Sequence, residues 1–205
     1  MSNFWIDLKD IISSSGEIAL LAIFAQNIIF TRALGTSASL YVVRKNYSLR
    51  FFGLIMAIIT TLSSCILYFF RRPINNLRYI NYIRPFIYVV TVSIVYVAVL
   101  LFCGKFLSKH IDKIKPMVHL SAFNGAVFGA LLINATAKTD FWGYLAFGIG
   151  TGIGFILASY LIEVGFERLN STKIPRAFRG FPITLIYIGI LSLAFHGLIG
   201  HELSM

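Results

Sequence analysis

Long stretches without a charged residue dominate the hydrophobic pattern of this chain. Five of these stretches have 20 to 22 residues each, and they cover residues 51–70, 85–104, 116–137, 141–162 and 180–201. About 20 apolar residues span the hydrocarbon core of a bilayer as an α-helix. The stretches are too long and too uniformly apolar to be the alternating strands of a membrane barrel. The pattern therefore predicts five membrane-spanning helices at these positions.

The pattern near the amino terminus predicts a sixth helix that is interrupted. Residues 18–31 carry no charge, Arg32 ends this run, and the apolar pattern resumes over residues 33–43. In lipid every backbone N–H and C=O group must be paired within the protein, which favours helices throughout. The sequence therefore predicts an all-α integral membrane protein with six transmembrane helices, in which residues 1–205 form a single membrane domain.

The composition agrees with a membrane protein and argues against a nucleic-acid partner. Hydrophobic residues make up 58% of the chain and charged residues only 13%, whereas soluble domains are about one quarter charged. The net charge of +10 therefore belongs in the loops of a membrane protein rather than on a nucleic-acid-binding surface. We expect a multi-pass protein of the cell membrane, with the lipid bilayer as its first partner.

Lysine and arginine residues are unevenly divided between the two sides of this predicted topology. The loops after the first, third and fifth helices contain the basic stretches 44–50, 105–115 and 168–179. Because cytoplasmic loops carry the excess of positive charge, this distribution places these loops in the cytoplasm and both termini outside. The arginines within residues 71–84 lie on the opposite side and argue against this orientation.

The six predicted helices divide into two repeats of three, covering about residues 16–107 and 116–201. Because three is an odd number, the second repeat enters the membrane from the opposite side, which produces an inverted repeat. The first helix of each repeat carries an asparagine, Asn27 or Asn124, well inside its apolar run. We therefore predict that helices 1 and 4 are interrupted near the membrane midplane and that the two amides meet there.

Two interpretations of these amides remain open. A polar group at this depth faces the bundle interior or a cavity, so Asn27 and Asn124 either join neighbouring helices by hydrogen bonds or line a pathway. Glycines follow both asparagines, Gly35 in the first helix and Gly125 and Gly129 in the fourth. We expect Gly35 and Gly129 to mark helix breaks or close helix packing.

Glycines also recur in the fifth apolar run, where residues 148–154 read GIGTGIG. A phosphate-binding loop requires a preceding strand, which is absent here, whereas Gly148 and Gly152 have the G-x-x-x-G spacing that permits close helix contact. Cys65 and Cys103 fall within apolar runs and are expected to be small buried residues. The residues alone offer no catalytic triad and no zinc-ligand spacing, so they predict no catalytic or metal-binding residue.

Several stretches resemble a known family of membrane subunits. Residues 167–197 contain ERL, the pattern P-x-x-FRG and the stretch LSLAF, while residues 27–35 read NIIFTRALG and residues 123–134 read FNGAVFGALLIN. Together these resemble RnfA, RnfE, NqrD and NqrE, the six-helix membrane subunits of the Rnf and Nqr electron-transport complexes, with RnfA and NqrE closest in pattern. The resemblance covers nearly the whole chain and implies the same inverted repeat of three plus three helices.

The resemblance also implies a cofactor, for which this chain lacks the ligands. In RnfA-like subunits the interrupted first and fourth helices each present one cysteine, and a second six-helix subunit supplies two more to a shared [2Fe–2S] cluster. The corresponding positions here are Ser37 and Gly125. The candidate midplane site therefore comprises Asn27, Ser37, Asn124 and Gly125, without the thiolates of the usual cluster.

Three hypotheses follow for the function. The first is a diverged Rnf/Nqr-type subunit that acts as a transmembrane scaffold for electron transfer, with a second six-helix subunit and flavin-bearing redox subunits as partners. The second is a transporter or permease component that binds a small substrate or ion at the midplane. The third is a structural anchor for a flavoprotein, in which Asn27 and Asn124 tolerate apolar replacement.

Overall fold

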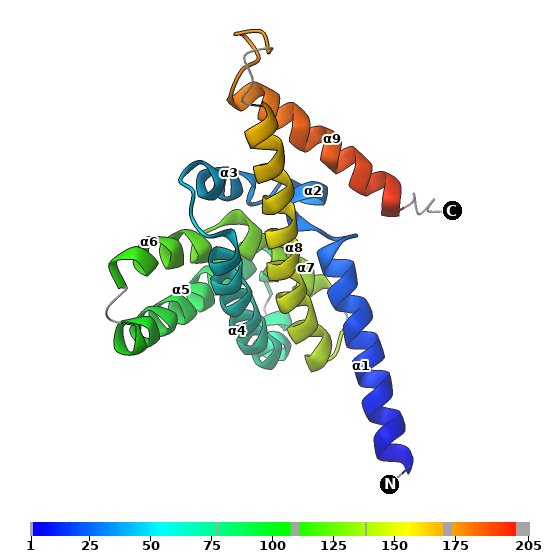
Figure 1. The fold of residues 1–205 in the computed structure, drawn as a ribbon. Coiled ribbons are helices and arrows are strands. Elements are labelled where there is room, and N and C mark those ends of the chain that lie inside the picture. The colour runs from blue at the N-terminus through cyan, green and yellow to red at the C-terminus, as the bar shows by residue number, and fades with distance from the viewer. Residues whose placement is uncertain (1, 77, 108–110, 138, 170–173, 200–205) are drawn as a thin grey trace.

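A computed structural model of the chain describes residues 2–76, 78–107, 111–137, 139–169 and 174–199 (Figure 1). These residues form helices and no strand, in agreement with the predicted all-α class. The helices are α1 (Ser2–Ile23), α2 (Ile28–Arg32), α3 (Thr36–Arg44), α4 (Leu49–Asn75), α5 (Ile80–Phe106), α6 (Ile111–Ala122), α7 (Gly125–Thr136), α8 (Phe141–Leu169) and α9 (Phe181–Ile199).

Three of the described helices are long and apolar enough to cross a membrane by themselves. They lie at Leu49–Asn75, Tyr82–Phe106 and Phe141–Leu169 and correspond to predicted spans two, three and five. A fourth span is possible if α6 and α7 count as one, because both are apolar and a bend of 42° separates them. The described residues therefore support a multi-pass membrane protein and contain three to four candidate spans, and the six-helix inverted repeat stays a prediction.

The first and last predicted spans are not single helices long enough to cross the membrane in the structure. The chain leaves helical geometry after Ile23 and again after Arg32, so α1, α2 and α3 share the region where one helix was predicted. The apolar part of α9 covers only Phe181–Gly197, which is short for a complete crossing. The end of its predicted span, at residues 200 and 201, lies outside the described residues.

The helix α8 occupies the centre of the bundle, with α1 along one side and α4 along another (Figure 1). Its glycines allow these close approaches. A Cβ added to Gly148 would lie 2.8 Å from Thr61 Cα, and one added to Gly152 would lie 2.7 Å from Ala57 Cα, both on α4. A Cβ on Gly150 would lie 2.7 Å from the Ala19 carbonyl oxygen of α1. One face of α8 therefore packs against α4 and another against α1.

Replacing Gly152 by alanine is expected to destabilise the bundle by about 1–3 kcal/mol, because the new methyl group overlaps the backbone of α4. Thermal unfolding of the purified protein in detergent, followed by circular dichroism, measures the effect. Gly189 on α9 provides the matched control, since a Cβ there has no heavy atom within 4 Å. Because alanine favours helices more than glycine does, Gly189→Ala is expected to leave the stability unchanged or slightly raised, and an equal loss in both variants would show that the contact with α4 is not the cause.

Candidate functional site at the paired helix breaks

The first break is organised by the side chain of Asn27, which is only 1% exposed. Its oxygen accepts hydrogen bonds from the backbone N–H groups of Ile29 (3.2 Å) and Phe30 (3.4 Å) and so caps the start of α2. Its nitrogen donates to the carbonyl oxygens of Ile23 (2.8 Å) and Gly154 (3.0 Å). The Asn27 amide therefore provides hydrogen-bond partners for backbone groups at the end of α1 and the start of α2, and it also links the break to α8.

Asn124 has a related but weaker role at the second break, between α6 and α7. Its side chain is 4% exposed, and its oxygen accepts a 2.7 Å hydrogen bond from the N–H of Ala126 as the N-cap of α7. Its nitrogen contacts Met56 Sδ at 4.0 Å, which is a weak acceptor. Like Asn27, Asn124 accepts a hydrogen bond from a backbone N–H group at a helix break. The two amide nitrogens bond to different neighbours, Gly154 and Met56, and not to each other.

The two breaks meet through their glycines. Gly35 has a φ of +83°, which an L-residue rarely adopts, and forms the N-cap of α3. A Cβ on Gly35 would lie 2.6 Å from Ala126 Cβ and 3.1 Å from Asn124 Oδ1. A Cβ on Gly125 would lie 3.7 Å from the Gly35 nitrogen. The backbone at residues 33–36 therefore lies directly against the backbone at residues 124–126.

Leu34 packs beside this contact, and two positions at the contact are exposed. Leu34 fills the space beside Gly129, where an added Cβ would overlap its side chain. Ser37 and Gly125 are both exposed, and the Ser37 hydroxyl has no hydrogen-bond partner among the described residues. The two positions that the family resemblance predicts to be cysteine positions are thus both exposed at the paired breaks.

The side chains present do not fit a four-thiolate cluster. The two cysteines, Cys65 on α4 and Cys103 on α5, are partly buried and lie in helices away from the breaks. Cys65 lies nine residues along α4 from Met56, the α4 residue that contacts Asn124, or about 13 Å at 1.5 Å per residue. No group of three His, Cys, Asp or Glu side chains in the described part of the chain is placed to hold a metal ion. Ser37 and Gly125 offer one hydroxyl and no side chain, respectively.

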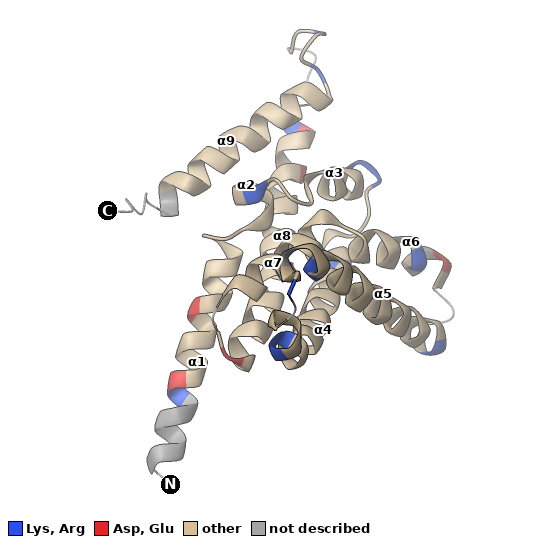
Figure 2. Ribbon diagram, turned by 180° about the vertical axis from the view of Figure 1, so that it is seen from behind, with Lys and Arg blue, Asp and Glu red and all other residues tan. Residues whose placement is uncertain are grey.

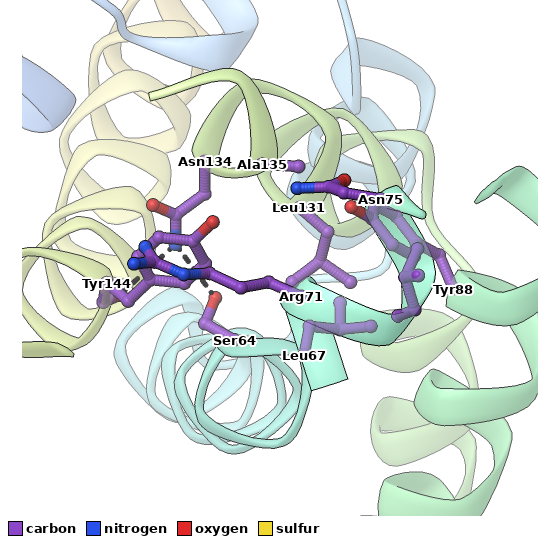
Figure 3. A pocket seen from close by; sticks show the side chains of 10 residues that line it. Ser64, Leu67, Arg71, Asn75, Tyr88, Leu131, Asn134, Ala135 and Tyr144 are labelled. Atoms are coloured by element: carbon purple, nitrogen blue, oxygen red, sulfur yellow. Dashed lines mark hydrogen bonds between the residues drawn. The ribbon is translucent and has the colours of Figure 1, made fainter. Parts of the chain in front are cut away.

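A second polar cluster lies between α4, α7 and α8, and the sequence analysis missed it (Figure 3). Asn134, 1% exposed, donates to Ser64 Oγ (3.2 Å) and to the carbonyl oxygen of Tyr144 (3.3 Å). Its own oxygen is buried and has no partner among the described residues. Arg71 extends along the cavity wall and donates to the Thr139 carbonyl oxygen at 3.0 Å. The enclosed volume is about 10 Å³, close to that of one water molecule.

One signal in the sequence could have revealed this cluster. Asn134 ends the apolar stretch FNGAVFGALLIN, in which it is the second amide of the same broken span. An amide at that position requires partners inside the bundle, as Asn124 does. The partner on α4 is Ser64, and small hydroxyl residues are too common in membrane helices to indicate contacts by themselves.

Comparison with known proteins assigns the chain to a family. The family model described as "Rnf-Nqr subunit, membrane protein" matches residues 16–201. The chain belongs to the Rnf-Nqr family of membrane subunits. This match confirms the resemblance drawn from the P-x-x-FRG and LSLAF motifs.

Curated relatives cover nearly the entire chain. The A component of the Na⁺-translocating ferredoxin:NAD⁺ oxidoreductase complex of Acetobacterium woodii is 27% identical over 186 residues, which span 91% of this chain and 97% of the relative. The A component of the ion-translocating oxidoreductase complex of Aliivibrio fischeri is 26% identical, with coverage of 87% and 92%. The E component of the Na⁺-translocating NADH-quinone reductase of Idiomarina loihiensis is 28% identical, with coverage of 91% and 98%. These relatives are subunits of oxidoreductase complexes, which does not support the transporter hypothesis.

Proposed function

We propose that this chain is a membrane subunit of an ion-translocating oxidoreductase complex of the Rnf/Nqr type. It acts as a transmembrane scaffold for electron transfer and contributes no cysteine ligand to a [2Fe–2S] cluster. The family match over residues 16–201 supports the assignment to this class of complex. The replacement of both family cysteine positions, by Ser37 and Gly125, supports the second part of the proposal.

The observation that carries the proposal is the direct contact of the two helix breaks. Gly35 of the first break lies against Asn124 and Ala126 of the second, although about 90 residues separate them in the chain. This is the arrangement expected if residues 16–107 and 116–201 form inverted repeats whose first helices are interrupted at the midplane. The breaks are retained here without the thiolates, so in this chain their role is structural.

The exposed side of the paired breaks is the place where we expect a second six-helix subunit. Ser37 and Gly125 are accessible there, and apolar side chains next to them are exposed as well, with Phe123 at 49% and Leu34 at 37%. A companion subunit of the same family would cover this surface within the cell membrane. Flavin-bearing redox subunits complete the complex on the two sides of the membrane, and both termini of this chain lie outside.

Site-specific photocross-linking tests this arrangement. A photoreactive residue at Ser37 is expected to cross-link a second membrane subunit in native membranes. Ile94 provides the control, because it is 61% exposed on the long apolar helix α5 and faces lipid in this account. The proposal fails if Ile94 captures a membrane subunit and Ser37 captures only lipid.

A further inference from the structure

Four arginines lie in and beside the turn between α4 and α5. The neighbouring sequence contains no carboxylate that could pair with them. Arg71 and Arg72 lie near the end of α4, Arg78 lies in the turn, and Arg84 lies near the start of α5. No aspartate or glutamate occurs anywhere in residues 18–111. We call these four residues the arginine hairpin. No counter-charge for them comes from this segment of the chain.

The depth of the arginine hairpin follows from the helices that it joins. Both α4 and α5 (Figure 1) are long and apolar enough to cross a membrane, and we infer from this that the turn between them lies at a membrane surface. Arg71 and Arg84 each lie four residues inside their helix end, or about 6 Å at 1.5 Å per residue. Tyr79 and Tyr82 are 61% and 78% exposed beside them, and tyrosines are enriched at membrane–water interfaces.

The four guanidinium groups differ in how many contacts they make with the rest of the protein. Arg71 donates to the Thr139 carbonyl oxygen and lies over the Tyr68 ring at 4.6 Å, so its guanidinium group is already held by contacts within the bundle. Arg84 donates from Nη2 to Asn75 Oδ1 at 3.2 Å, but its Nε–H is buried and has no partner among the described residues.

The two arginines nearest the turn are the most available. Arg72 and Arg78 are exposed, and neither forms a hydrogen bond or an ion pair with the described part of the chain. Figure 2 shows basic positions of α4 at this end of the bundle. Asp140, the residue before α8, accepts a 2.9 Å hydrogen bond from the Gly143 N–H at the start of that helix.

We propose that the arginine hairpin binds the phosphate group of an anionic phospholipid. Guanidinium groups pair with phosphate through two parallel N–H···O bonds, and the available donors on Arg72 and Arg78 lie at headgroup depth. A lipid supplies both the missing negative charge and an apolar tail for the exposed face of α5 at Phe86 and Val90. The arginine hairpin then reflects lipid recognition, and its charge does not report the orientation of the chain in the membrane.

Native mass spectrometry of the full-length protein, titrated with phosphatidylglycerol or phosphatidylcholine in detergent, tests this proposal. In Arg72→Gln/Arg78→Gln the dissociation constant for phosphatidylglycerol is expected to rise about 25-fold, while weak binding of phosphatidylcholine stays the same. The matched control is Arg44→Gln/Lys45→Gln, which removes two exposed charges at another turn and is expected to change the constant by less than about twofold. Thermal unfolding checks that both variants are folded.

Three results would overturn the proposal. Equal losses in both double variants would show a general charge effect and no site. An unchanged dissociation constant in Arg72→Gln/Arg78→Gln would show that these arginines do not hold the lipid. Loss of a protein subunit from the purified complex, with phosphatidylglycerol binding unchanged, would show that the arginine hairpin docks a protein instead.

Discussion

Replacing Asn27 by leucine is expected to destabilise the protein by about 3–5 kcal/mol. The substitution removes the acceptor for the N–H groups of Ile29 and Phe30 and the donor for the carbonyl oxygens of Ile23 and Gly154. Each buried polar group left without a partner costs about 1–3 kcal/mol, and no water is present in the hydrocarbon core to replace the amide. Chemical denaturation in mixed micelles measures the free energy of unfolding.

Asn124→Leu is the matched comparison, because the same change removes one strong hydrogen bond, from Ala126 N–H, and one weak sulfur contact. We expect a loss of about 1–2 kcal/mol for this variant. Equal effects of the two substitutions would contradict the account, since the hydrogen bonds assign the larger role to Asn27. Full tolerance of both would instead favour the anchor hypothesis raised from the sequence.

Restoring both thiolates, in Ser37→Cys/Gly125→Cys, is expected to give the purified complex about two additional iron atoms. The structure accommodates both changes. Ser37 is exposed, and a Cβ on Gly125 has only ordinary contacts, at 3.7 Å to Gly35 N and 4.0 Å to Leu34 Cδ2. With two cysteines from the companion subunit, which the family resemblance implies, four thiolates would surround one [2Fe–2S] cluster. Iron analysis and the EPR spectrum of the reduced complex measure the gain.

The single variants Ser37→Cys and Gly125→Cys are the controls, and neither is expected to gain a stable cluster because each supplies one thiolate. A folded double variant that assembles with its companion subunit and binds no additional iron would show that these positions do not face the companion's cysteines. The same iron gain in Gly125→Cys alone would show that Ser37 lies outside the ligand shell.

The sequence located the helix breaks because asparagine and glycine have specific backbone roles. Asn27 and Asn124 are N-caps in the structure, and Gly35 has the positive φ that only glycine adopts readily. The sequence analysis expected the two amides to meet, whereas in the structure Gly35 lies beside Asn124 and the amides bond to different neighbours. The hydrogen bond from Asn27 to Gly154 could not be predicted, because it depends on how α8 packs against α1.

The number of complete spans was harder to predict than the existence of helices. An uncharged run of 20 residues shows that a segment is apolar, but it does not show whether the helix continues through it. At residues 18–43 the helix stops twice, at Ile23 and Arg32, so length and hydropathy alone cannot define one span. The cluster around Asn134 depends on Ser64 and Tyr144 from two other helices, which no local pattern brings together.

The central claim is that this chain is a scaffold subunit of a redox complex and holds no iron–sulfur cluster through its own cysteines. Iron and acid-labile sulfide, measured on the intact complex purified with this chain and with its Cys65→Ala/Cys103→Ala variant, test it most directly. The account predicts co-purifying flavin-bearing subunits and the same iron and sulfide content in both preparations. Equal amounts of iron and sulfide that disappear together in the variant would contradict it.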